Sequence, residues 1–414
     1  MAVIFPIFMN VFQKIKETNL SEALLILILV SLPLGGYAIN SIAIVLFLLS
    51  AIFNYFVNKE KIRFHKIALL FIIFYIVCFA SLLWTDDINI TKAGLSRFLS
   101  YLVLPLSFVF FSNKKFHKEK IIELFSKSLV FYAGYCIFLG SINSIVNSDI
   151  SYLFYHKLSN NLSNLNAIYL SVFVSFGISF FLNKKEKSKF EMFCLAFLSL
   201  FLILLSSKII ILITFLTFIF LLFKKRKYTK IKVKYLLIIP VISLFFLVAS
   251  TNLFKRVKVE FEKTKITEVL NKKEFGHVYL WTGAGLRVFQ IKAFFEILKE
   301  EKNIFLGFGL NNSQKTLNTK YKEYNLYPGF LNYNYHNQYL QVFSELGVIG
   351  LGVLLLIFFL IIKDAIIYKD YFLLSFIILI LVVCITESFL WRQRGMVFFI
   401  TISLLFSQRK KFSI

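Results

Sequence analysis

Long apolar runs alternate with short polar segments along most of this 414-residue chain. Each run approaches the roughly 20 residues that an α-helix needs to cross the hydrocarbon core of a bilayer. The run 190–223 is too long for one span, and Ser206-Ser207-Lys208 interrupts it near its middle, so it predicts two helices. On this criterion the sequence predicts an all-α, polytopic membrane protein with about twelve transmembrane helices. The predicted spans lie near residues 20–36, 38–57, 67–84, 95–111, 121–146, 166–182, 190–223 (two helices), 235–252, 339–362, 371–390 and 395–407.

Lysine clusters occupy every second loop between these spans. Cytoplasmic loops of membrane proteins are enriched in Lys and Arg, so we expect these loops and both termini in the cytoplasm. The alternation depends on dividing 190–223, because a single helix there would invert every later loop. It predicts an N-terminal bundle of about nine spans in residues 1–252, a periplasmic loop in 253–338 and about three further spans in 339–414.

The long polar segment 253–338 has its own local pattern. Apolar positions in residues 285–301 recur at helical spacing and predict an amphipathic helix. Phe305-Leu306-Gly307-Phe308-Gly309 predicts a turn. Four tyrosines then precede a histidine in an irregular stretch, namely Tyr321, Tyr324, Tyr327 and Tyr333. Aromatic side chains of this kind suit sugar stacking and suit a membrane interface, and composition leaves both interpretations open.

Composition agrees with a membrane protein and excludes several classes of site. Hydrophobic residues make up 58% of the chain, and the formal net charge is +25. Because the basic residues lie in short loops between apolar runs, we assign the excess to topology and expect no nucleic-acid partner. The four cysteines each lie inside an apolar run, which indicates small core residues. The chain has no Walker-type phosphate loop and no HExxH motif, so we expect neither ATP-driven work nor zinc chemistry.

Five cations fall at the predicted outer face of the bundle. Arg287 opens the amphipathic helix, and Lys208 lies in the turn that divides the run 190–223. The others are Arg97, Arg392 and Arg394, which lie at the ends of predicted spans. Charges at membrane depth are costly and mark sites for anions, and an arginine fork matches a phosphate well. Together these cations could hold a diphosphate, and the alternative for each of them is an interfacial side chain that extends to lipid headgroups.

His336 lies where the polar segment meets the next apolar run. Imidazole exchanges a proton near neutral pH, so His336 is the candidate for acid–base chemistry. Asn337 follows it directly, and Gly347 and Gly350 would let backbones approach closely. Glu387 lies near Arg392 in sequence and could orient a site arginine. The alternatives are a structural histidine at an interface and a structural ion pair within the bundle.

These residues resemble the pattern of a known family. The frame His336-Asn337-x-Tyr339-Leu340, with Glu345, Gly347 and Gly350 after it, is similar to the signature of the bacterial O-antigen ligase and O-antigen polymerase family. Arg287 before an amphipathic helix resembles the external-loop pattern of that family. Ser207-Lys208 resembles its Ser-Arg turn, with Lys in place of Arg, and 164–169 resembles the Asn-rich start of a middle span.

The resemblance implies an architecture similar to that of membrane glycosyltransferases of the C type. It also implies transfer of a glycan from undecaprenyl diphosphate at the periplasmic face of the inner membrane, without a metal or nucleotide cofactor. Ligases place the glycan on the lipid A–core of lipopolysaccharide, and polymerases place it on another lipid-linked unit. His336 would then activate the acceptor hydroxyl, and Arg287 and Lys208 would bind the diphosphate. Lysine lacks the arginine fork and would contact the phosphate as a point charge.

Two classes of function remain open from the sequence. The first is an enzyme of this family, with ligase preferred to polymerase. The second is a non-enzymatic flippase or transporter of lipid-linked glycans. A transporter should carry charges deep in several spans that line a cavity. The predicted spans are almost free of charge in their middles, and the cations gather at one face, which favours chemistry at the interface.

Overall fold

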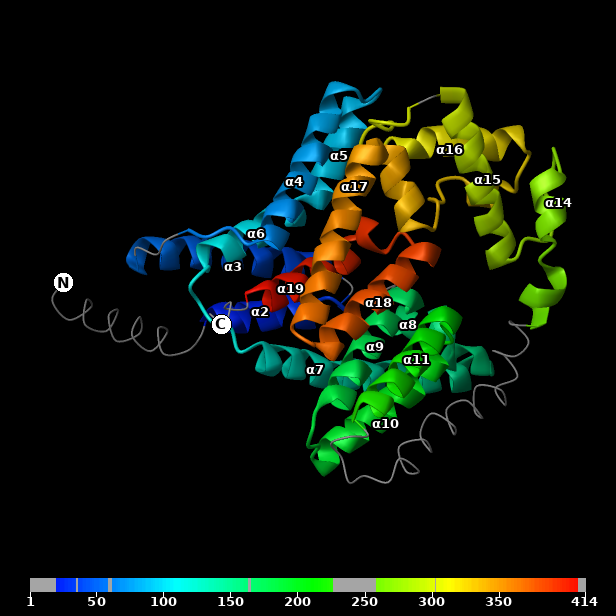
Figure 1. Ribbon diagram of the computed structural model, residues 1–414. Coiled ribbons are helices and arrows are strands. Elements are labelled where there is room, and N and C mark those ends of the chain that lie inside the picture. Colours follow the sequence, from blue (N-terminus) through cyan, green and yellow to red (C-terminus); the bar gives the residue numbers. More distant parts are fainter. Residues whose placement is uncertain are drawn as a thin grey trace, which may run out of the picture.

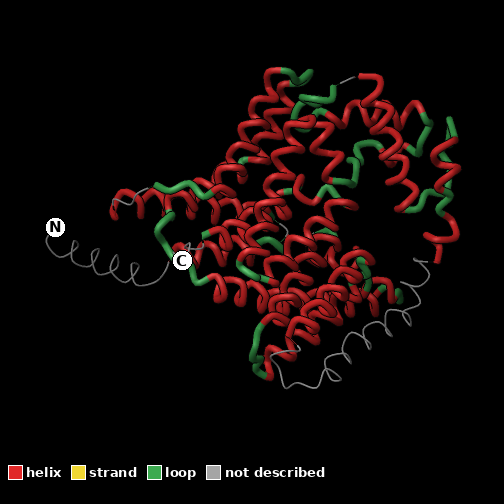
Figure 2. Tube along the Cα trace, viewed as in Figure 1, coloured by secondary structure: helices red, strands yellow, loops and turns green. Residues whose placement is uncertain are grey.

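The computed structural model describes residues 20–34, 36–58, 62–162, 165–225, 258–301 and 303–408. Throughout these residues the chain forms helices joined by turns and loops (Figure 2). The predicted span at 235–252, most of the basic loop before it and both chain ends lie outside the described residues. The all-α prediction is confirmed for the part of the chain that the structure describes.

Helices follow the predicted apolar runs closely. The first half of the chain forms α2 (Leu20–Val30), α3 (Tyr37–Asn58), α4 (Lys66–Ala80), η1 (Ser81–Leu83), α5 (Ile88–Phe98), α6 (Ser100–Phe110), α7 (Lys118–Val146), η2 (Ile150–Leu153), α8 (Tyr155–Ser159), η3 (Asn160–Leu162), α9 (Ala167–Asn183), α10 (Lys189–Leu204) and α11 (Lys208–Lys225). The second half forms α14 (Ile266–Asn271), α15 (Gly283–Glu301), α16 (Ser313–Glu323), η4 (Pro328–Phe330), α17 (Gln338–Ile367), α18 (Tyr371–Thr386), η5 (Phe389–Trp391) and α19 (Gln393–Ser407).

The predicted division of the run 190–223 is confirmed. Helix α10 ends at Leu204, and α11 begins at Lys208. Between them Ser206 adopts a φ of 51°, in the left-handed region, which reverses the chain within three residues. A serine side chain can hydrogen-bond to nearby backbone groups and so compete with helix formation. The Ser206 hydroxyl donates such a bond to the Ile203 carbonyl.

Five helices of the described residues are long and apolar enough to cross a membrane. They are α3, α4 with η1, α5 with α6, α7 and α17, and a bent pair within 155–183 adds a sixth if it counts as one span. Shorter apolar helices include α2, α18 and α19. These findings make the chain a multi-pass membrane protein, but a total of twelve spans stays a prediction, as do the three sequence regions assigned above. An 11-residue helix such as α2 rises only about 16 Å, well short of a bilayer core.

The centre of the bundle is built on α9 and α19, whose residues are buried on almost every side. A helix that is apolar all round belongs inside a protein. Accordingly, α7, α10, α11 and α18 pack on α9, and α2, α4, α6 and α17 pack on α19. Phe398 of α19 lies at the middle of an aromatic cluster, with ring centroids 4.9 Å from Phe173 and 5.1 Å from Phe176. Phe125 of α7 and Phe376 of α18 complete its surroundings.

The polar segment forms a second, smaller core. Helices α14, α15 and α16 lie together on one side of the molecule, beside the N-terminal part of α17 (Figure 1). The predicted helix 285–301 is confirmed as α15, and its apolar face is buried. Tyr321 is 1% exposed and belongs to this core, so its predicted place on a sugar-binding or interfacial surface is wrong. Tyr327 and Tyr333 are exposed, as that prediction requires.

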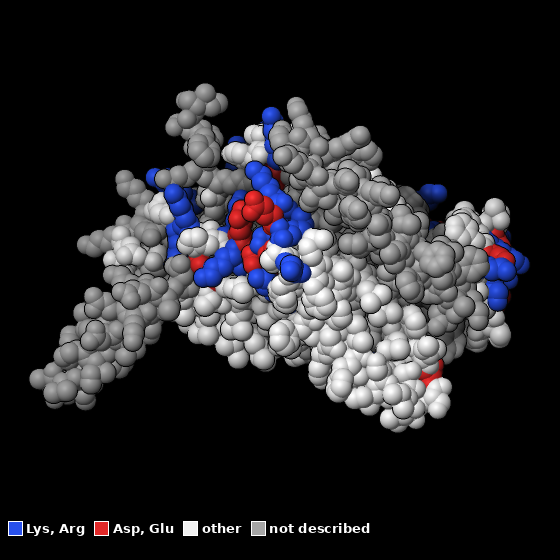
Figure 3. Space-filling model, turned by 90° about the horizontal axis from the view of Figure 1, so that it is seen from below, with Lys and Arg blue, Asp and Glu red and all other residues white. Residues whose placement is uncertain are grey.

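Charged residues gather at the ends of helices and leave wide surfaces uncharged. Figure 3 shows Lys and Arg clustered around acidic residues next to a broad surface that carries no charge. Lys184, after α9, pairs with Glu123 of α7 at 2.8 Å and with Glu191 of α10. At the C-terminal end of α19, the Gln408 side chain donates a hydrogen bond to the Phe108 carbonyl of α6.

Candidate active site

His336 directly precedes α17 in an unusual backbone conformation. Its φ is 44°, in the left-handed region that few residues other than glycine adopt. The Asn334 side chain accepts a hydrogen bond from the His336 amide at 3.0 Å. Asn337 then caps α17, because its Oδ1 accepts from the amides of Tyr339 and Leu340. Local polar contacts thus fix where the imidazole projects, and strained backbone of this kind is common at functional sites.

The C-terminal end of α18 gathers the predicted site residues. Asn337 Nδ2 donates to the Ile385 carbonyl at 3.1 Å, and Arg287 Nε donates to the Thr386 carbonyl at 3.0 Å. The last carbonyls of a helix have no partner within it and carry a partial negative charge, so they attract such donors. Residues far apart in sequence therefore meet at one helix end, on α15, α17 and α18 (Figure 1).

Glu387, the residue after α18, lies beside the imidazole. Its Oε2 is 3.3 Å from His336 Nδ1. The carboxylate is almost buried, while about a quarter of the His336 side chain is exposed. A carboxylate at Nδ1 favours the tautomer that carries its proton there, which leaves Nε2 as a proton acceptor. The predicted role of Glu387 was to orient an arginine, whereas the contact that the structure shows is with the histidine.

Lys208 is linked to the same region by Glu260, an acid that no sequence motif indicates. Its ammonium is ion-paired with Glu260, which lies in the helical residues 258–263. The other oxygen of Glu260 accepts from the Ala284 amide at 2.7 Å, at the start of α15. Arg287 lies on the same turn of α15, where one guanidinium nitrogen donates to the Gly283 carbonyl at 3.0 Å. Glu260 therefore joins Lys208 to the helix end that carries Arg287.

The surroundings of Glu260 resemble those that a phosphate would need. Burial raises the pKa of this carboxyl, but the hydrogen bond from Lys208, the Ala284 amide and the Arg287 charge outweigh burial and hold it below its ordinary value. An ammonium, a helix N-terminus and a guanidinium thus all stabilise negative charge at this point. No motif in the sequence around Glu260 could have indicated this role.

The remaining predicted cations occupy two other places. Arg97 and Arg392 both lie against the indole of Trp391, with guanidinium carbons 3.9 and 5.4 Å from the ring centroid. The indole nitrogen donates to buried Glu345 at 3.0 Å. Arg394 is buried and donates to the Leu34 carbonyl at 2.9 Å. The structure therefore joins Arg287 and Lys208 around Glu260, and it places the other three arginines in separate contacts.

Gly347 breaks α17 into two segments, which Figure 1 shows meeting at a bend. Its φ of 62° and ψ of −160° belong to a region open almost only to glycine. A Cβ at this position would lie only 2.1 Å from the backbone carbonyl oxygen of Phe305, which is too close for any side chain. The predicted close approach of two backbones is therefore confirmed at Gly347. A Cβ at Gly350 would meet Leu346 of the same helix, so that glycine is required by the bend itself. The bend sets residues 338–346 along the last turns of α18, where Tyr339 donates to the Leu381 carbonyl.

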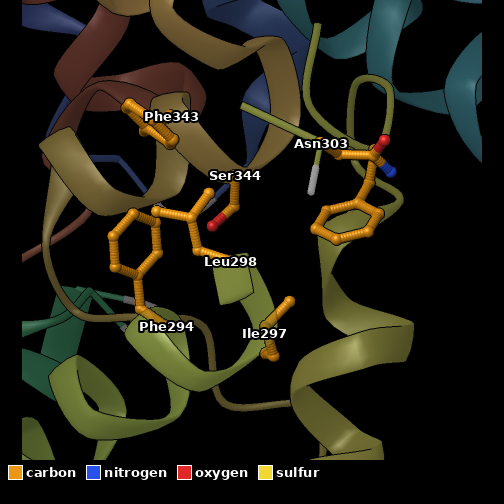
Figure 4. Close-up of a pocket in the computed structure, with 7 residues that line it drawn as sticks. Phe294, Ile297, Leu298, Asn303, Phe343 and Ser344 are labelled. Atoms are coloured by element: carbon orange, nitrogen blue, oxygen red, sulfur yellow. The ribbon is translucent and has the colours of Figure 1, made fainter. Parts of the chain in front are cut away.

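Two hollows in the described residues lie away from this cluster. A small cavity of about 10 Å³, at the lower limit for holding one water molecule, lies between α15, the loop after it and α17 (Figure 4). Its walls are mainly apolar side chains such as Phe294, Ile297 and Phe343. An open depression of about 540 Å³ lies at the start of α7, near the far end of α19. The described residues contain no group of three or more His, Cys, Asp or Glu that could hold a metal, and metal independence stays a prediction.

The segment that carries these features matches a known family. Residues 192–355 fit the family model described as O-antigen ligase. This segment is similar to the O-antigen ligase family. The match runs from α10 to the middle of α17 and includes Lys208, Arg287 and His336. Glu387 and the other three arginines lie outside it. No curated protein matches the chain.

Proposed function

We propose that this protein transfers a glycan from an undecaprenyl diphosphate carrier to the lipid A–core, at the periplasmic face of the inner membrane. The family match supports a reaction on lipid-linked glycans. The observation that carries the proposal is the convergence of His336 and Arg287 on consecutive residues of one helix end, Glu387 and Thr386. This convergence supports a site in which an imidazole takes the proton and a neighbouring guanidinium binds the diphosphate.

The reaction follows from these neighbours. Nε2 of His336 takes the proton from an acceptor hydroxyl, whose oxygen attacks the anomeric carbon of the donor glycan. The bond between that carbon and the phosphate oxygen breaks, and the carrier leaves as a diphosphate. Glu387 stabilises the imidazolium that forms. Because diphosphate is a good leaving group, positioning and charge stabilisation supply most of the rate.

Arg287 is held in place for a phosphate contact. Its two backbone hydrogen bonds use only part of a guanidinium that has five N–H donors. These bonds fix the fork at the start of α15 and leave further donors for a phosphate oxygen. An arginine held in this way loses little conformational entropy when the donor binds.

Lys208 takes part once the donor diphosphate displaces Glu260. The ammonium, the Ala284 amide and the nearby guanidinium already surround one carboxylate. A diphosphate carries more charge and more acceptor oxygens than a carboxylate, so it competes well for the same donors. Glu260 thus keeps the cations in position before the donor arrives.

Deletion of the gene, followed by examination of the cell-surface glycans, tests the proposal. We expect loss of all long-chain glycan from the lipid A–core, with the chains accumulating on their lipid carrier. Capping of the core by a single repeat unit would instead identify a polymerase. Unchanged surface glycans would contradict both.

A further inference from the structure

The loop after α15 is attached to α17 at its break. Residues 303–309 run across the bend, where the amides of Phe308 and Gly309 donate to the Ser344 and Glu345 carbonyls at 2.8 and 2.9 Å. On the far side of the bend, the Val348 amide donates to the Ile304 carbonyl at 2.9 Å. The loop therefore sits at the depth of the bend, wherever α17 lies in the membrane.

The outward side of this loop is apolar. Ile304, Phe305 and Leu306 are 40, 71 and 42% exposed, and no charged side chain occurs in residues 303–312. Val348 and Ile349 of α17 are exposed beside them, and exposed apolar side chains continue down the helix. Leu83 of η1 is 87% exposed, and its neighbour Trp84 donates from the indole to the Leu306 carbonyl at 3.0 Å. One apolar surface thus joins a candidate span to part of the polar segment.

The length of α17 sets the depth of this surface. From Val348 to Ile362, the residue before Lys363, the helix rises only about 22 Å. A bilayer core is about 30 Å thick. If Lys363 marks one boundary of the hydrocarbon core, the bend lies short of the opposite boundary. The bend and the loop bonded to it then lie inside the core.

Several backbone groups of the loop are bonded to protein. An irregular segment at membrane depth must have its polar groups satisfied by protein. The Phe308 and Gly309 amides are bonded to α17, the Gly307 amide donates to the Asn303 carbonyl, and the carbonyls of Ile304 and Leu306 also accept hydrogen bonds. An indole that donates at this level matches the preference of tryptophan for the membrane interface.

We propose that Ile304, Phe305 and Leu306, together with Leu83, insert into the acyl chains of the leaflet on the side of the His336 cluster. The partner is the phospholipid hydrocarbon, and the insertion holds α15 and α16 down against the membrane. The sites for substrate then face the bilayer surface, where lipid-borne molecules arrive. This inference does not depend on the proposed reaction.

Spin labelling of the full-length protein in phospholipid vesicles tests the insertion. A nitroxide is attached to Phe305→Cys, and its collisions with oxygen and with a water-soluble nickel chelate are measured. The matched references are Leu356→Cys, an exposed position on α17, and Lys322→Cys, an exposed position on α16. The four native cysteines are buried. Leu83→Cys provides an independent reporter on another element at the same level.

We expect the label at position 305, or at position 83 if the first variant does not fold, to match the lipid reference. Oxygen collisions should then exceed those at position 322, and nickel collisions should fall several-fold below them. Nickel accessibility equal to that of the Lys322→Cys label would overturn the proposal. A label shielded from both reagents would also overturn it, because a second protein surface would then cover the loop.

Discussion

At the scale of single residues, neighbouring groups determine what the His336 imidazole can do. The Asn334 side chain accepts a hydrogen bond from the His336 amide. The Tyr333 ring lies edge-on to the imidazole, with ring centroids 5.7 Å apart, and Glu387 Oε2 lies 3.3 Å from Nδ1. Of these, only the carboxylate can set the tautomer and stabilise a charged ring. Arg287 and Lys208 have the same dependence on a second group, since Glu260 and the end of α18 hold them in place.

The contact between Glu387 and His336 predicts a specific kinetic defect. Glu387→Gln should lower kcat for glycan transfer by about 10- to 100-fold, because the neutral amide does not stabilise an imidazolium and can enforce the wrong tautomer. KM for the donor should change little, since Glu387 does not bind the phosphates. Steady-state kinetics of the purified protein measures both quantities.

The matched control is Glu262→Gln, which alters an exposed acid paired with Lys258 at 3.7 Å. This variant should keep the rate of the wild-type protein. A kcat for Glu387→Gln equal to that of the control would show that Glu387 does not act through His336.

At the scale of elements, the break in α17 and the end of α18 build the site together. Gly347 turns residues 338–346 toward α18, and the freed carbonyls of Ser344 and Glu345 accept amides from the loop 303–309. The end of α18 then supplies carbonyls to Asn337 and Arg287. Neither helix would present the cluster if α17 continued straight.

Gly347→Ala should therefore destabilise the protein by about 2 to 5 kcal/mol, from backbone strain and from the clash with Phe305. The expected result is a clear fall in the thermal unfolding midpoint of the detergent-solubilised protein. Gly352→Ala is the matched control, because a Cβ there meets no atom within 4 Å and alanine favours a helix. Equal midpoints for the two variants would contradict the role of the break.

At the scale of the whole molecule, hydrophobic pattern predicted the helices well because each apolar run is long and bounded by polar residues. The division at Ser206 and the buried face of α15 were both readable from local spacing. The bend at Gly347 was not, since a glycine in an apolar run does not reveal its φ. The Lys208–Glu260 pair joins residues 52 positions apart, and the cluster at Trp391 joins Arg97 to a distant loop. Such contacts depend on tertiary packing, which local sequence does not encode.

In the proposed reaction His336 accepts the proton during glycan transfer, and one comparison of variants tests this role. Purified wild-type, His336→Ala and His277→Ala proteins are reconstituted with a lipid-linked glycan donor and its acceptor, and initial rates of transfer are measured. His277 is exposed in the same polar segment and serves as the control. We expect the transfer rate to fall by about 10²- to 10⁴-fold for His336→Ala alone, with donor binding retained. Transfer by His336→Ala at the rate of the His277→Ala protein would contradict it.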